Sequence, residues 1–158
     1  MKRLPELPTE VKALATAALT FGGLAVLMGL TYIVAAHSGS DGSYNVSVSD
    51  IAALYTGPGA SMATIISLAH IHLLGLFSVF SVIGFIFVHS TLSSGVKSVL
   101  VVTPFLAFFV DVSGWFLTKL LAPGFVYLVI LGGATFSLAI ATMILISLYE
   151  LWIAPIRK

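Results

Sequence analysis

The stretch FVYLVILGGATFSLAIATMILISLYELW, residues 125–152, decides the fold, because it is apolar throughout and carries only one charged side chain, Glu150. A helix of about 20 apolar residues crosses the hydrocarbon core of a bilayer, which is roughly 30 Å thick. Three more such segments occupy residues 13–36, 59–89 and 97–120, to within a few positions. These runs lack the alternation of barrel strands and therefore predict helices. We expect an all-α fold, one four-transmembrane-helix bundle spanning residues 1–158 as a single integral membrane domain.

The composition agrees with a membrane protein. Of the 158 residues, 59% are hydrophobic and 8% are charged, and the mean hydropathy is +1.13. No soluble domain of this size can bury so much apolar surface. The first segment, about 24 residues long, exceeds the usual 7–15-residue core of a signal peptide, so we interpret it as a retained span. The net charge of +1 gives no indication of nucleic-acid binding. A chain without cysteine forms no disulfide and attaches no c-type haem covalently.

The basic residues predict the orientation in the membrane. Only Lys119 lies at one end of the expected bundle, and the other six lie at the opposite end: Lys2, Arg3, Lys12, Lys97, Arg157 and Lys158. Because positively charged flanks remain in the cytoplasm, both termini and the 90–96 turn are predicted to be cytoplasmic. The outer loop is then residues 37–58. We expect a multi-pass protein of the bacterial inner membrane.

Smaller patterns predict details of the connections and the packing. Residues 44–48 alternate like a short strand, and Ser49 with Asp50 is expected to cap a short interfacial helix anchored by Tyr55. In the last span, a row of small residues predicts close helix packing: Gly133, Ser137 and Ala141. Four aromatic residues near the span ends are expected in the interfacial belts: Trp115, Tyr127, Tyr149 and Trp152.

The stretch AHIHLLG, Ala69–Gly75, places two histidines in the second span. At 100° per residue, His70 and His72 are about 200° apart, so they leave the helix on nearly opposite faces and cannot chelate one metal ion together. His70 shares its side with Ser67, Ser78, Ser81 and His89, whereas His72 lies on an apolar face. An ionisable side chain inside a bilayer is a functional-site hypothesis by default. Because the two histidines lie on opposite faces of the helix, we expect each of them to contact a different partner group.

Depth in the membrane suggests what these histidines contact. At 1.5 Å per residue, His70 and His72 lie roughly 16–20 Å from the outer end, and Asp111 lies roughly 14 Å from it. A histidine N–H bonded to Asp111 would leave its other ring nitrogen free for a metal. Met28, about 12 Å deep, could complete a His/Met haem site. His70 and His72 are thus metal-ligand candidates, Met28 and His37 are further axial candidates, and Asp111 is a supporting residue. Purely structural hydrogen bonds between helices are the alternative.

The run AHIHLLGLFSVFSVIGFIFVHS, residues 69–90, resembles the helix of haem-copper oxidase subunit I that carries a His-x-His pair. In that family the residue matching His70 ligates the high-spin haem, and the residue matching His72 ligates the low-spin haem. The resemblance covers one helix. This chain lacks the histidine cluster for copper and the tyrosine linked to it, so it is not subunit I itself.

A second resemblance covers most of the chain. Its segments are HSGSDGSYNVSVSDIAALYTG, HIHLLGLFSVFSVIGFIF, TPFLAFFVDVSGWFLTK, LGGATFSLAI and SLYELW. Together they are similar to a family of small bacterial four-helix inner-membrane proteins, some with a periplasmic cytochrome c insert containing CxxCH. The connection here is short and cysteine-free. The resemblance implies a setting in respiratory electron transfer, with His70, His72 and Asp111 in the motif positions. Any c-type haem would then belong to a separate partner.

Three hypotheses follow for the function. In the first, the bundle binds haem b and passes electrons between quinol and a periplasmic cytochrome c, with a quinone site beside it. In the second, it is a non-catalytic accessory subunit of a larger membrane-protein complex. In the third, the polar side of the second span forms a proton or ion pathway, although Leu74 and Phe85 interrupt it. In the first two we expect a subunit, surrounded by the lipid bilayer, rather than a stand-alone enzyme.

Overall fold

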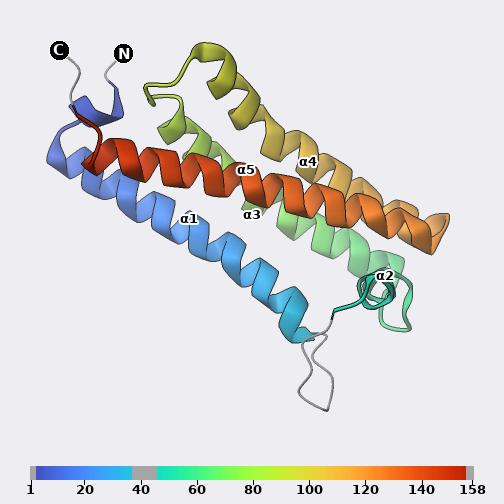
Figure 1. The fold of residues 1–158 in the computed structure, drawn as a ribbon. Coiled ribbons are helices and arrows are strands. Elements are labelled where there is room, and N and C mark those ends of the chain that lie inside the picture. Colours follow the sequence, from blue (N-terminus) through green and yellow to red (C-terminus); the bar gives the residue numbers. More distant parts are fainter. Residues whose placement is uncertain (1–2, 37–45, 156–158) are drawn as a thin grey trace.

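The computed structural model describes residues 3–36 and 46–155, and its regular structure is all helical. Four helices are long and apolar enough to span a membrane, which confirms the predicted fold class. The five α-helices are α1 (Thr9–Ala36), α2 (Val48–Thr56), α3 (Met62–Phe87), α4 (Ser94–Leu120) and α5 (Val126–Trp152). Two short 3₁₀ helices, η1 (Leu4–Glu6) and η2 (Pro123–Phe125), precede α1 and α5. Figure 1 shows this arrangement.

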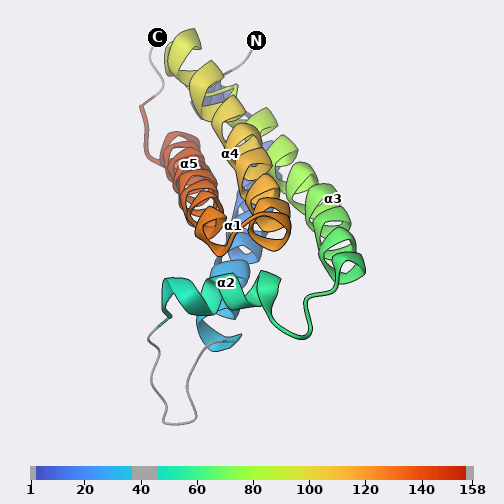
Figure 2. The same ribbon diagram turned by 90° about the vertical axis from the view of Figure 1, so that its right-hand side faces the viewer.

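The two ends of the bundle differ. The chain enters and leaves at the same end, which we call the terminal end, and α2 lies across the other, the α2 end (Figure 1 and Figure 2). At the terminal end, the Leu4 backbone N–H donates to the His89 carbonyl, with an N–O distance of 3.0 Å, and the Leu4 side chain is buried. The Lys97 ammonium donates to the carbonyls of Val88 and Ser90 at 2.9 and 3.3 Å. These bonds satisfy carbonyls at the end of α3.

The short helix α2 begins slightly earlier than the sequence suggested. Its N-cap is Ser47, whose hydroxyl accepts from the Asp50 N–H at 3.2 Å, while the Asp50 carboxylate accepts from the Ser47 N–H at 2.9 Å. This reciprocal pair is a capping box. The prediction of Ser49 as the cap was therefore wrong. The predicted strand was also wrong over its described part, because α2 already begins at Val48, and residues 44–45 lie outside the described residues.

The helices α4 and α5 pack so closely that only glycine fits at two positions. A Cβ atom on Gly132 would lie 2.6 Å from the Ala107 carbonyl oxygen and 2.7 Å from the Asp111 nitrogen. A Cβ on Gly114 would lie 2.8 Å from a Val129 methyl group. Small residues allow such close approach between membrane helices, where lipid removes the usual hydrophobic drive for association.

The predicted packing row in α5 was wrong at Gly133 and Ala141, whereas the hydroxyl of its third member, Ser137, is buried. A Cβ on Gly133 would meet nothing within 4 Å, and Ala141 is exposed. The neighbouring Gly132 makes the contact with α4 instead. Beyond this contact, the centre of the bundle is filled by aromatic rings: Phe80 of α3 lies 5.6 Å from both Phe105 and Phe136, between ring centroids. The core therefore joins α3, α4 and α5.

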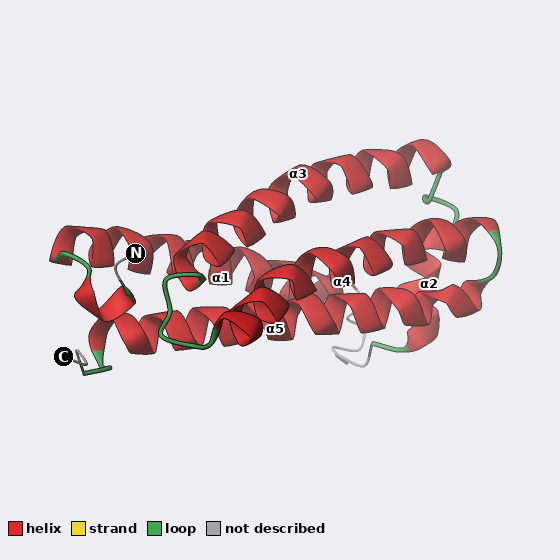
Figure 3. Cartoon of the chain, turned by 90° about the horizontal axis from the view of Figure 1, so that it is seen from above, coloured by secondary structure: helices red, strands yellow, loops and turns green. Residues whose placement is uncertain are grey.

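Helices α1 and α3 touch near their middles and separate toward the α2 end, as Figure 1 and Figure 3 show. A Cβ on Gly22 would lie 3.0 Å from Ile83 and 3.5 Å from Val79, so the helices are in contact there. Closer to the α2 end, Gly29 of α1 and Gly75 of α3 are exposed, and a Cβ added to either would meet nothing within 4 Å. We call this stretch, where the backbones of α1 and α3 diverge, the α1–α3 opening.

The two adjacent glycines of α5 predict opposite effects of the same substitution. Gly132→Ala should lower the free energy of unfolding by about 1–3 kcal/mol, because its Cβ would overlap the α4 backbone. Gly133→Ala is the matched control and should raise stability by up to about 1 kcal/mol, since alanine is the better helix former in open space. Thermal unfolding in detergent measures both. Equal effects at the two positions would contradict the α4–α5 packing.

Candidate functional site

His72 lies on the stripe of α3 that faces the bundle. The residues of this stripe recur at helical spacing, and its buried members include Ile65, Ala69, Phe80 and Ile83. His72 falls between the second and third of these, yet it is exposed. The reason is that it lies at the level of the α1–α3 opening, where no side chain of the described residues covers it completely. The inward stripe thus carries one polar side chain at the open part of the bundle.

The imidazole of His72 has one nitrogen in a hydrogen bond and one without a partner among the described residues. Nδ1 lies 2.8 Å from the Leu68 carbonyl oxygen. A carbonyl oxygen only accepts, so Nδ1 carries a proton and donates, and in the neutral ring Nε2 presents its lone pair. Within the described part of the chain, no hydrogen bond engages Nε2. A backbone carbonyl holding one ring nitrogen is the usual support of a metal-bound imidazole.

Trp115 connects His72 to the buried carboxylate of Asp111. Its ring meets that of His72 edge to face, with centroids 5.2 Å apart and an interplanar angle of 87°. Its indole N–H donates to Asp111 Oδ1 at 3.2 Å. The bond that we expected from a histidine to Asp111 is therefore made by Trp115. Trp115 is buried, 7% exposed, so it packs inside the bundle, and its level in the membrane stays a prediction. The i, i+4 spacing of Asp111 and Trp115 on a helix was the signal for their contact.

Tyr55 brings α2 onto this group. Its ring stacks on Trp115, with centroids 5.9 Å apart and planes 24° apart. Burial raises the pKa of the Tyr55 phenol above its usual value, and the Asp111 charge acts in the same direction. Tyr55 is thus a packed contact between α2 and α4 rather than a simple interfacial anchor. We call Tyr55, His72, Asp111 and Trp115 the Trp115 cluster.

His70 is outside this cluster. It is exposed on the outward side of α3, as are Ser67 and Ser78, and the Ser78 hydroxyl bonds back to the Leu74 carbonyl at 2.8 Å. This confirms that the two histidines leave α3 on different faces. The polar side of α3 therefore faces outward along part of its length, and its assignment as a proton or ion pathway stays a prediction.

The remaining ligand candidates lie on or near α1. Met28 is 71% exposed, one residue from Gly29 in the α1–α3 opening. His37 lies outside the described residues. Among the described residues, no group of three or more His, Asp or Glu side chains could hold a bare metal ion.

Four spanning helices with a short helix across one end define the class of the protein, a multi-pass integral membrane protein in contact with the lipid bilayer. A family model, Aq_1264_TM, described as a transmembrane helical domain, matches residues 45–158. This is more than half of the chain, which therefore belongs to that family. The match contains α2, α3, α4 and α5, whereas α1 lies outside it. No curated protein and no solved structure matches the chain significantly.

The bond between Trp115 and Asp111 predicts non-additive effects on stability. Trp115→Phe should lower the free energy of unfolding by about 1–3 kcal/mol, because it leaves the buried carboxylate without its donor. In an Asp111→Leu background the same change should cost less, since no carboxylate remains to be satisfied. A double-mutant cycle measured by thermal or denaturant unfolding tests this, with a coupling of about 0.5–3 kcal/mol expected. Additive effects would contradict the bond.

Proposed function

We propose that the chain is a membrane subunit of a bacterial respiratory or other redox complex, with its termini in the cytoplasm. In this proposal it holds a b-type haem through His72 and passes electrons between quinol and a periplasmic cytochrome c. One observation supports it above all others. His72 has its Nδ1 held by the Leu68 carbonyl, and its Nε2 lacks a partner among the described residues at the open part of the bundle.

The residues around His72 fit a flat, largely apolar group. Gly29 and Gly75 leave space on α1 and α3, and the exposed side chains on α3 near His72 include Ile71. A haem would supply a one-electron carrier whose potential depends on its axial ligands. His72 supplies one ligand. Three candidates could supply the second: Met28 on α1, His37, or a residue of another subunit.

The Trp115 cluster has a positioning role in this proposal. The Leu68 carbonyl fixes the His72 tautomer, and the edge-to-face contact with Trp115 limits the rotation of the imidazole ring. Asp111, bonded to the Trp115 indole, holds that ring in place. The electron donor and acceptor must come from outside the bundle, because the described segments between the helices are short. This favours a subunit over a stand-alone enzyme.

A second function is supported by the outward side of α3. His70 and Ser67 expose polar side chains where the surrounding helix is apolar, and unpaired polar groups are costly in lipid. A helix of a larger membrane enzyme would cover them and supply hydrogen-bond partners. In that case the chain is an accessory subunit, and the histidines stabilise the assembly. The two functions are compatible if the partner also carries the electron acceptor.

The two histidines predict different spectra for otherwise matched variants. His72→Ala should abolish the b-type α band of the dithionite-reduced minus oxidised spectrum, because it removes the proposed axial ligand. His70→Ala, two residues away and also exposed, is the control and should retain the band. The protein is expressed with added haem precursor and purified before measurement. A colourless wild-type protein, or loss of the band only in His70→Ala, would contradict the proposal.

The accessory function predicts a different result for His70. Gentle solubilisation of native membranes should release the wild-type chain together with larger partners, and His70→Leu should weaken that association. Native gel electrophoresis followed by mass spectrometry of the excised band measures both. A small oligomer of this chain alone, unchanged by the substitution, would contradict this role.

A further inference from the structure

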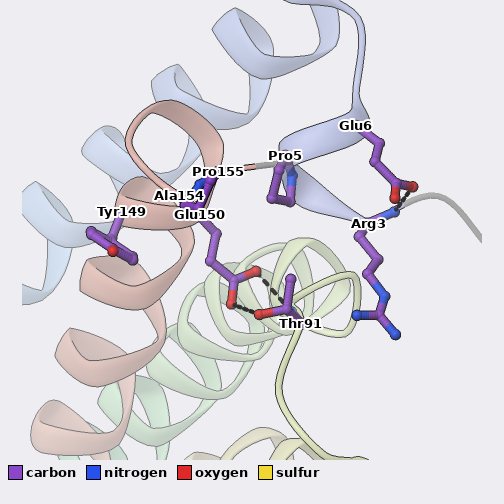
Figure 4. A pocket seen from close by; sticks show the side chains of 8 residues that line it. All are labelled: Arg3, Pro5, Glu6, Thr91, Tyr149, Glu150, Ala154 and Pro155. Carbon is purple, nitrogen blue, oxygen red and sulfur yellow. Dashed lines mark hydrogen bonds between the residues drawn. The ribbon is translucent and has the colours of Figure 1, made fainter. Parts of the chain in front are cut away.

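A pocket at the terminal end combines charges of both signs. Its cavity volume is about 470 Å³, and it lies between η1, the α3–α4 turn and the end of α5. Charged and polar side chains that line it are Arg3, Glu6, Thr91, Tyr149 and Glu150. Figure 4 shows Glu150 and Thr91 on one side and Arg3 with Glu6 on the other. We call this the terminal pocket. It is at the opposite end of the bundle from the Trp115 cluster.

Glu150 is held in place at the wall of the pocket. It is only 4% exposed, and its two carboxylate oxygens accept from the Thr91 hydroxyl at 2.7 Å and the Thr91 N–H at 2.8 Å. Each oxygen has further acceptor capacity, because a carboxylate accepts about four hydrogen bonds. The Glu6 carboxylate accepts from the backbone N–H of Arg3 at 3.1 Å, and the Arg3 side chain is exposed. The pocket thus presents two carboxylates and one guanidinium.

The terminal pocket lies at the ends of the spanning helices, where the headgroups of a bilayer are expected. Its residues immediately precede the span that begins at Thr9, lie in the α3–α4 turn or belong to the end of the span that ends at Trp152. Trp152 marks the boundary, since its indole N–H donates to the Thr16 hydroxyl at 2.9 Å and the Lys12 ammonium lies 5.9 Å from its ring. Indole rings and lysine side chains gather at this level of a membrane.

We propose that the terminal pocket binds the headgroup of an aminophospholipid. The phosphate is bound by the Arg3 guanidinium, which forms paired bonds to phosphate oxygens. The primary ammonium donates to Glu150 and Glu6. A simple anion is disfavoured by two carboxylates, and a choline headgroup has no N–H to donate. A zwitterion with an inner phosphate and a terminal ammonium matches both signs of charge. This inference is independent of the haem proposal.

The matched pair of phosphatidylethanolamine and phosphatidylcholine tests the proposal. They carry the same formal charges and differ in whether the ammonium can donate hydrogen bonds. Native mass spectrometry of the full chain, titrated with each lipid in detergent, measures the dissociation constants. We expect phosphatidylethanolamine to bind about tenfold more tightly, as one or two charge-assisted hydrogen bonds would produce. Equal binding of the two lipids would overturn the proposal.

Two variants and their controls locate the site. Glu6→Gln should reduce the preference for phosphatidylethanolamine, and Glu10→Gln, an acidic residue outside the pocket, should not. Arg3→Gln should weaken the binding of both lipids, and Lys119→Gln at the α2 end should not. These changes spare Glu150, whose bonds to Thr91 support the α3–α4 turn. No difference between Glu6→Gln and Glu10→Gln, together with none between Arg3→Gln and Lys119→Gln, would overturn the site.

A water-soluble headgroup distinguishes a membrane lipid from a free phosphoethanolamine compound as the ligand. Glycerophosphoethanolamine has the same phosphate and ammonium but no acyl chains. It should compete only weakly with the lipid, because the chains add contacts along the apolar helix surfaces. Competition at the same concentration as the lipid would overturn a membrane lipid as the ligand.

Discussion

The contact between Gly132 of α5 and the backbone of α4 at Ala107 and Asp111 is the constraint on which the rest of the structure depends. In a bilayer the hydrophobic effect does not drive helices together. Close packing therefore depends on van der Waals contact between complementary helix surfaces. The missing side chain of Gly132 lets α5 reach the backbone at Asp111, which buries that carboxylate in the bundle. Trp115, one turn along α4, satisfies the carboxylate. The Trp115 ring then receives Tyr55 from α2 and His72 from α3.

The same arrangement separates a closely packed part of the molecule from a loosely packed one. The family model covers α2 to α5, the helices that contribute the Trp115 cluster and the aromatic core. Helix α1 lies outside that match and is mostly exposed beyond Gly22, where it leaves α3. The open part of the bundle therefore lies between the family domain and its additional helix. His72 stands at this boundary, which is why a histidine on an otherwise apolar stripe has a ring nitrogen that no described residue engages.

Much of the fold was predictable, because the length of an apolar run and the thickness of a bilayer leave few choices. The opposite faces of His70 and His72 also followed from helical spacing alone. The rotation of each helix about its own axis was harder. Gly132 and Gly133 are equally small in the sequence, and only the partner helix decides which of them is covered. The position of Trp115 along α4 likewise does not show that Tyr55 covers it. The hydrogen-bond donor to Asp111 was likewise predicted to be a histidine. The position of a residue along its helix gives its depth in the membrane, but it does not show toward which neighbouring helix the side chain points.

The separation of α1 from α3 at the level of His72 is the central claim, and a distance measurement in a bilayer tests it directly. The chain contains no cysteine, so pairs of spin labels can be introduced without background. One pair, Leu27→Cys with Leu74→Cys, reports on the α1–α3 opening, and a second, Ala17→Cys with Phe85→Cys, reports on the contacting halves. All four positions are exposed. Double electron–electron resonance should give a longer and broader distance distribution for the first pair. Equal distances for both pairs would show that the helices stay packed and would contradict the opening.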